Sequence, residues 1–237
     1  MAAKLKSILR QIHWSSLLKA AVFGAAWLWL PYWAFFFAAL YLYYVPIFEA
    51  KKLGIPFFIL LILAYLQGQG IFPALIFSAI FYGILLIKDL LIIDRRSAYE
   101  LLGLVESFLL LRIFYSHFTE GPSGLAVTIG FFVATALTLL LNSFIQCFRD
   151  ESGDIHGVRR AGVWLSLPLF SQMIITGLFL PLDFLYQAVS VFLISVLVFD
   201  LLPDHLARIG SRQKTLATVS VVFSLFVIVL ASANWGI

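Results

Sequence analysis

Charged residues and cysteine are scarce in this sequence. Only 12% of the residues are charged, against about 25% in a typical soluble domain, whereas 62% are hydrophobic. The single cysteine, Cys147, excludes an intrachain disulfide and a paired-cysteine metal or redox site. The sequence also contains no P-loop, dinucleotide-binding glycine pattern or nucleophile elbow. These absences exclude a nucleotide-driven motor within the chain.

The hydrophobic residues gather in long runs, which predict an all-α, polytopic transmembrane helix bundle. A bilayer core about 30 Å thick needs roughly 20 apolar residues per helix. We expect residues 1–237 to form a single integral membrane domain, with membrane segments over 14–235. Polar and proline breaks divide it into about nine segments, at roughly 14–30, 32–48, 53–66, 71–87, 98–118, 124–147, 161–180, 182–202 and 215–235.

The first four segments form two short hairpins. As a helix, residues 53–66 would reach only about 21 Å, so these hairpins are expected to be thin, tilted or re-entrant. A tight turn at Pro31 is expected to close the first hairpin. This turn would place Trp27, Trp29 and Trp33 at the membrane interface, where tryptophan is enriched.

The positive charges fall on alternate breaks between the segments. All but one of the 16 Lys and Arg residues lie at the N-terminus or at every second break, and the exception is Arg112. The positive-inside rule therefore predicts that the N-terminus is inside and the C-terminus outside. We expect a multi-pass protein, in the plasma membrane if the source is prokaryotic. The net charge of +4 then reflects orientation in a lipid bilayer rather than binding of nucleic acid.

The first residues have a different pattern. Lys4 and Arg10 alternate with apolar Leu5, Ile8 and Leu9 at helical spacing. This pattern predicts a basic amphipathic helix over 1–13, lying in the membrane interface.

Two ionisable residues, Glu106 and Arg112, interrupt the fifth hydrophobic segment. A charge at the centre of a membrane helix costs about 2.5–3.5 kcal/mol, so such residues are candidates for function. The two residues are about 240° apart around a helix and are not expected to face each other. We interpret them as the substrate path of a small-solute permease. The alternatives are a structural contact between helices and snorkelling of Arg112 to the outer surface.

The longest polar run is residues 149–160, on the predicted cytoplasmic side. Carboxylates such as Asp150 and Asp154 suit Mg²⁺, which binds through one or two carboxylates together with substrate phosphates. Arg159 could contact a phosphate. The alternative is a solvated loop of mixed charge.

The spacing Asp150-x-x-Gly-Asp154, followed by Gly157 and Arg159, resembles the second aspartate motif of UbiA-type intramembrane prenyltransferases. The resemblance implies a nine-helix fold whose cytoplasmic active site would use Asp150, Asp154 and Mg²⁺ on a lipid diphosphate. The family's first, Asn/Asp-rich motif should fall near 46–54, where Glu49 is the only acidic residue. The resemblance therefore implies half of the diphosphate site, as in a degenerate enzyme.

Three functions are compatible with these features, and whether the protein is an enzyme stays open. The first is a membrane-embedded subunit or scaffold that contacts other membrane-protein subunits and needs no cofactor. The second is the permease with Glu106 and Arg112 in its path. The third is the prenyltransferase with Asp150, Asp154 and Mg²⁺. The four histidines have no metal-ligand spacing, so a zinc or haem site is not predicted.

Overall fold

The computed structural model describes residues 14–45, 53–89, 95–119, 121–152, 156–206 and 210–233, which form helices and no strand. For 95–96, 146–152, 156–163 and 206 it describes the backbone alone. The helices of this described part are α2 (Trp14–Trp29), α3 (Tyr32–Tyr44), α4 (Gly54–Gln67), α5 (Ile71–Lys88), α6 (Arg95–His117), α7 (Gly124–Ser152), α8 (His156–Leu178), α9 (Phe184–Leu206) and α10 (Arg212–Ser232). One helix lies on each of the nine predicted segments, which confirms the all-helical prediction. The predicted helix at 1–13 lies outside the described residues.

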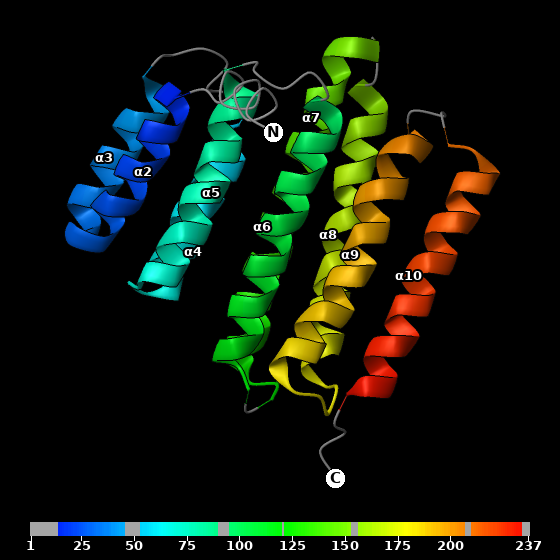
Figure 1. The fold of residues 1–237 in the computed structure, drawn as a ribbon. Coiled ribbons are helices and arrows are strands. Elements are labelled where there is room, and N and C mark those ends of the chain that lie inside the picture. The colour runs from blue at the N-terminus through cyan, green and yellow to red at the C-terminus, as the bar shows by residue number, and fades with distance from the viewer. Residues whose placement is uncertain are drawn as a thin grey trace, which may run out of the picture. The chain divides into compact units, whose positions relative to one another are not determined.

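The chain divides into two compact units, Met1–Ala98 and Tyr99–Ile237. The boundary falls in the first turn of α6, so α2–α5 belong to unit 1 and nearly all of α6–α10 to unit 2 (Figure 1). Each unit is described by itself below. That the whole chain acts as one membrane domain stays a prediction.

Four helices are long and apolar enough to cross a membrane: α5, α7 over Gly124–Ile145, α9 over Phe184–His205, and α10. Helix α4 and the Trp164–Leu178 part of α8 are apolar but shorter. Helix α6 has 23 residues but contains several ionisable side chains, and it is not among the four. These helices support a membrane location for the protein.

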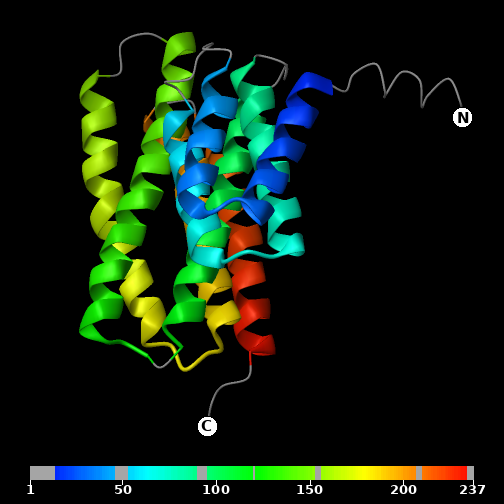
Figure 2. The ribbon, with the colours of Figure 1, turned by 90° about the vertical axis from the view of Figure 1, so that its left-hand side faces the viewer.

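Unit 1 is built from short helices around an aromatic core. Helix α2 packs against α3 and α5, and α4 packs against α5 (Figures 1 and 2). Phe23 stacks on Phe81 with ring centroids 4.4 Å apart, and Tyr43 stacks on Phe57 at 4.1 Å. With 13 residues, α3 reaches only about 20 Å, as expected for a short hairpin, whereas α5 is long enough to cross a membrane.

Two lysines close the C-terminal end of α3. Lys19 of α2 donates a hydrogen bond to the carbonyl of Val45, 2.6 Å away, and buried Lys88 of α5 donates one to the carbonyl of Tyr43. The last carbonyls of a helix have no partner within the helix, so these bonds replace the missing ones. Both predicted basic positions therefore lie at one end of unit 1.

The opposite end of unit 1 is closed by the turn between α4 and α5. The side-chain amide of Gln69 donates to the carbonyls of Trp27 and Leu30, 3.0 and 3.3 Å away, at the end of α2. Trp27 is only 1% exposed, and its buried indole N–H donates to the carbonyl of Ala64 at 3.2 Å. Trp27 thus packs inside unit 1, whereas its neighbour Trp29 is 83% exposed.

In unit 2, α7 packs against α8, α8 against α9, and α9 against α10. Because consecutive helices are antiparallel, the C-terminal ends of α7 and α9 lie at the same end of this unit as the N-terminal ends of α8 and α10 (Figure 1). Helix α6 is joined to the others by Tyr99, whose hydroxyl is 2.6 Å from that of Ser143 in α7, and by Tyr115, which donates to the carbonyl of Ile174 in α8 at 2.9 Å. Pro168 does not break α8, which is continuous across it.

Candidate functional site

A pocket of about 580 Å³ lies between α8, α9 and α10 of unit 2. Helix α9 forms its floor, because α9 packs against both α8 and α10. The volume is within the range of about 300–1,000 Å³ that is usual for small-molecule sites. The pocket is therefore large enough for a ligand.

The lining of this pocket changes from apolar to polar along α9. Leu169, Met173 and Ile194 line the apolar part, whereas Asp204 and Lys214 lie where α9 ends and α10 begins, with His205 beside them. The helical rise from Ile194 to His205 is about 17 Å, close to half of a hydrocarbon core. The pocket is thus amphipathic along its length.

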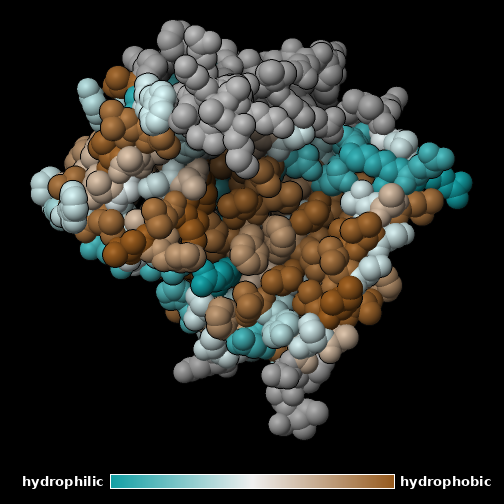
Figure 3. All heavy atoms as spheres, viewed as in Figure 1, coloured by the Kyte–Doolittle hydropathy of each residue, from teal (hydrophilic) through white to brown (hydrophobic). Residues whose placement is uncertain are grey.

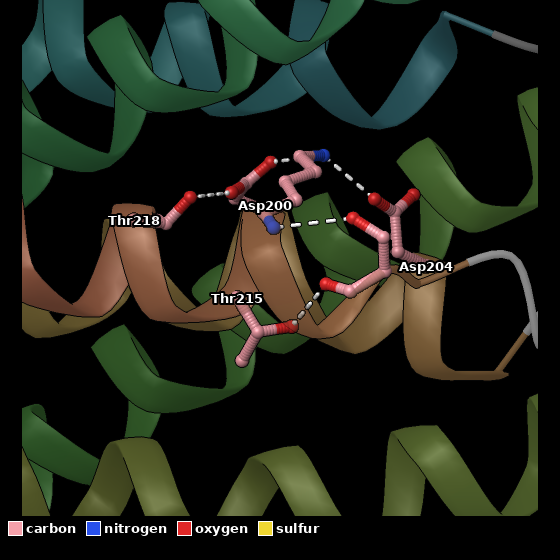
Figure 4. Close-up of polar contacts among 6 residues, drawn as sticks. Asp200, Asp204, Thr215 and Thr218 are labelled. Carbon is pink, nitrogen blue, oxygen red and sulfur yellow. Dashed lines mark hydrogen bonds and ion pairs between the residues drawn. The ribbon is translucent and has the colours of Figure 1, made fainter.

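Lys214 forms an ion pair with two aspartates at the polar end. Its Nζ atom lies 2.6 Å from Oδ2 of Asp204 and 2.9 Å from Oδ1 of Asp200. The two aspartates are one helical turn apart on α9 and both point toward the first turns of α10 (Figure 4). Thr218 Oγ1 donates to Oδ2 of Asp200 at 2.9 Å. We call Asp200, Asp204 and Lys214 the charged triad.

The cap of α10 holds Lys214 in position. Ser211 Oγ accepts a hydrogen bond from the backbone N–H of Lys214 at 3.1 Å, which is the usual N-cap arrangement. Thr215 Oγ1 donates to the carbonyl of Ser211 at 3.2 Å (Figure 4). Helix α10 therefore begins at a defined residue, and its first turn presents Lys214 to α9.

Sequence reasoning missed the charged triad because of small errors in helix bounds. The predicted segments ended at 202 and began at 215, which left Asp204 and Lys214 in a loop. In the structure α9 continues to Leu206 and α10 begins at Arg212, so both residues are helical. The i, i+4 spacing of Asp200 and Asp204 places both carboxylates on one face of a helix, and this spacing could have indicated the pair.

The predicted permease residues lie on α6. Glu106 is fully buried, and neither of its carboxylate oxygens has a hydrogen-bond partner among the described residues. Arg112 is half-buried. The ion pairs of the described part of the chain do not include one between Glu106 and Arg112. Their role in a substrate path stays a prediction.

The predicted prenyltransferase residues lie at the α7–α8 connection. Asp150 is in the last turn of α7 and Arg159 in the first turn of α8, where the backbone alone is described, and Asp154 lies outside the described residues. Within the described ranges no group of three His, Cys, Asp or Glu residues could hold a metal ion. The Mg²⁺ site at Asp150 and Asp154 stays a prediction.

Unit 1 contains a smaller hollow, of about 240 Å³, between α3 and α4. Its walls are aromatic and aliphatic, and Tyr32 and Tyr65 meet edge-on across it with ring centroids 5.1 Å apart. None of its lining residues carries an acidic or basic side chain. It offers no polar end of the kind found in unit 2.

Comparison with known proteins finds no matching family model, no similar curated protein and no similar solved structure. The resemblance to UbiA-type prenyltransferases therefore rests on the motif residues alone.

Proposed function

We propose that this is a multi-pass membrane protein that works as a membrane-embedded subunit and binds an amphipathic molecule in the pocket of unit 2. The observation that carries the proposal is the change in the pocket lining, from Met173 and Ile194 at one end to Asp204 and Lys214 at the other. Ligand sites in proteins are mostly apolar and contain a few polar groups that fix orientation. A lipid-like molecule would pack its chain along α9 and hold its head group beside the charged triad.

The walls of the pocket support entry from the surrounding bilayer. Only 6% of α10 is buried, against 39–44% of the other three candidate spans, and Leu165 and Leu169 of α8 are also exposed. In the view of Figure 3, hydrophobic side chains cover a broad part of the surface, and one group of hydrophilic side chains lies near the start of α10. A ligand with an apolar chain could therefore move from lipid to pocket without crossing water.

We also propose the orientation given by the charges, with the N-terminus and the basic connections inside. It is supported by Lys19 and Lys88, which contact the same end of α3 in unit 1. An amine reagent that cannot cross membranes should leave Lys51 and Lys52 unlabelled in intact cells. Labelling of these lysines from outside would contradict the orientation.

The proposed binding in the pocket is tested by a substitution that fills the pocket with a larger side chain. Leu169→Trp adds bulk to the pocket wall and should lower, several-fold, the labelling of α8–α10 peptides by a long-chain photoactivatable alcohol in membranes. The matched control is Leu225→Trp on α10, because Leu225 is about as exposed as Leu169, 45% against 38%, but does not line the pocket. Equal labelling of the two variants would contradict the proposal.

The permease is a second candidate, supported by the burial of Glu106 without a hydrogen-bond partner in the described residues. It requires that Glu106→Gln abolishes solute flux while the protein still inserts into the membrane. The prenyltransferase requires that Asp150→Asn and Asp154→Asn remove a Mg²⁺-dependent activity on lipid diphosphates. The described residues add no support to that third function.

A further inference from the structure

We infer that the apolar part of the molecule bound between α8, α9 and α10 is a flexible alkyl chain rather than a fused ring system. The inference rests on the proposed function, because it names the class of molecule that the same pocket would take. Two features of the pocket support it: its described walls contain no ring of Phe, Tyr or Trp, and their apolar side chains lie in two long stripes.

Aliphatic side chains make up the apolar part of the pocket lining. Eight of the described lining residues are Leu, Ile, Val or Met, and none is Phe, Tyr or Trp. The stretches 153–163 and 206–209, which adjoin the walls in the sequence, contain no Phe, Tyr or Trp either. The smaller hollow of unit 1 is lined in the opposite way, because five of its seven lining residues are Phe or Tyr. The two hollows therefore offer different surfaces to an apolar ligand.

Helices α8 and α9 do carry aromatic rings, but these rings make other contacts. Phe170 of α8 and Phe199 of α9 meet with ring centroids 6.4 Å apart, and Phe199 also meets Phe144 of α7 at 6.2 Å. Phe192 of α9 meets Phe108 of α6 at 5.3 Å. None of these five phenylalanines lines the pocket. The rings thus join the helices of unit 2 to one another, and the pocket is left with aliphatic side chains.

The apolar walls form two stripes along neighbouring helices. On α8 the stripe consists of Leu165, Leu169 and Met173, each four residues from the next, and on α9 it runs from Ile194 to Leu202. Residues at such spacing lie on one face of a helix, and each stripe is about 12 Å long. Because α8 packs against α9, the two stripes form a long trough that can hold an extended chain.

Most side chains of these stripes can adapt to a flexible ligand. Six of the eight apolar lining residues are Leu or Met, which are not branched at Cβ and keep more rotamers than Ile or Val. Such side chains can pack against an alkyl chain in several of its conformations. A planar fused ring gains most from stacking on aromatic side chains, which the described walls lack. The lining therefore suits a chain better than a ring.

The experiment compares apolar parts that carry the same head group. Octadecanol, pyrenylbutanol and cholesterol each have one uncharged hydroxyl group. They would compete, at equal mole fractions, with the photoactivatable alcohol for the full-length protein in phosphatidylcholine nanodiscs. We expect octadecanol to lower the labelling of α8–α10 peptides several-fold more than either ring compound does. Competition by pyrenylbutanol or cholesterol that equals or exceeds that of octadecanol would overturn the inference.

Two substitutions of Met173 test the cause of this preference. Met173→Phe places an aromatic ring in the wall and should raise the competition by pyrenylbutanol, relative to octadecanol, about threefold to tenfold, because the two ring systems can stack. The matched control is Met173→Leu, which keeps the wall aliphatic and should leave this ratio unchanged. An unchanged ratio in Met173→Phe, or an equal rise in Met173→Leu, would overturn the role given to the aliphatic walls.

The two proposals fail in different ways. If Leu169→Trp lowers the labelling and Leu225→Trp does not, the pocket binds amphipathic molecules. The inference about the alkyl chain alone then fails if the three alcohols compete equally. If Leu169→Trp and Leu225→Trp are labelled equally, the pocket is not the binding site and both proposals fail.

Discussion

The two units of this protein use polar side chains for different tasks. In unit 1, Lys19, Lys88 and Gln69 each bond to backbone carbonyls at the ends of short helices. In unit 2, polar side chains also pair with one another across helices, as Lys214 does with Asp204 and Tyr99 with Ser143. Short helices leave a larger share of their carbonyls and amides without partners, so more of their polar residues are needed at helix ends.

The hollows of the two units also differ in their polar side chains. The hollow of unit 1 is lined without a charged side chain, whereas the pocket of unit 2 ends in an ion pair. The comparison shows that charged side chains join two helices, α9 and α10, in unit 2, whereas in unit 1 lysines bond to carbonyls at the end of a helix. It also predicts that the units respond differently to matched substitutions.

The largest effect is expected at Trp27 in unit 1. Its ring is 1% exposed, packs edge-on against Phe77 at 5.6 Å and donates to the carbonyl of Ala64. Trp27→Ala should lower the stability of unit 1 by about 3–5 kcal/mol, because it leaves a cavity and an unpaired carbonyl. The measurement is the thermal unfolding midpoint of the purified protein in detergent.

Trp29, two residues along the same helix, supplies the control. It is 83% exposed, so Trp29→Ala should shift the midpoint by far less than Trp27→Ala. Similar losses in both variants would show that unit 1 is held by contacts with the membrane rather than by its aromatic core.

A matched pair of glycines compares the units directly. A Cβ atom on Gly177 of α8 would clash with the hydroxyl of Tyr115 and lie 3.0 Å from Cγ2 of Val191, whereas on Gly24 of α2 it would clash with the hydroxyl of Ser78. The Ser78 hydroxyl can rotate away, but the bonded ring of Tyr115 cannot. We expect Gly177→Ala to cost about 1–3 kcal/mol of unfolding free energy, and Gly24→Ala clearly less, in the same detergent assay.

Removing the clashing hydroxyl identifies the cause. Tyr115→Phe alone should cost about 1 kcal/mol, because it loses the hydrogen bond to the carbonyl of Ile174. In the Gly177→Ala background the same change should cost nothing or restore stability, since it relieves the contact. Strictly additive losses would mean that Tyr115 does not set the limit at Gly177.

The helices were predictable from the sequence because hydrophobic runs of near-bilayer length favour them. The run at 124–147, for example, became α7, Gly124–Ser152. The division into units was not predictable, because it depends on contacts between distant segments, such as the stacking of Phe23 on Phe81. The burial of Trp27 was not predictable for the same reason, since its hydrogen-bond partner Ala64 lies in another helix.

The candidate site was only partly predictable. Glu106 was singled out because a charge in an apolar segment is costly, and the structure places it in the interior. Asp200, Asp204 and Lys214 were missed because each lies within a few residues of a predicted helix end, where charge is expected. Whether such charges face water or each other depends on helix bounds and packing, which hydropathy does not determine.

The smallest change in stability is expected at Glu106. The residue is fully buried, and its carboxylate oxygens have no hydrogen-bond partner among the described residues. Replacing an unsatisfied buried polar group by an apolar one of similar size is often neutral or stabilising. Glu106→Leu should therefore change the free energy of unfolding by less than about 1 kcal/mol, or raise it, in the same thermal assay.

Whether the free energy of unfolding falls or rises in Glu106→Leu distinguishes a structural role of Glu106 from a functional one. A loss of more than about 2 kcal/mol would show that the carboxyl of Glu106 has a stabilising partner, as breaking a buried polar contact normally costs. A gain in stability would mean that the fold does not need the charge. A destabilising buried carboxyl is retained when activity requires it, so a more stable Glu106→Leu protein would favour the permease over a purely structural role for α6.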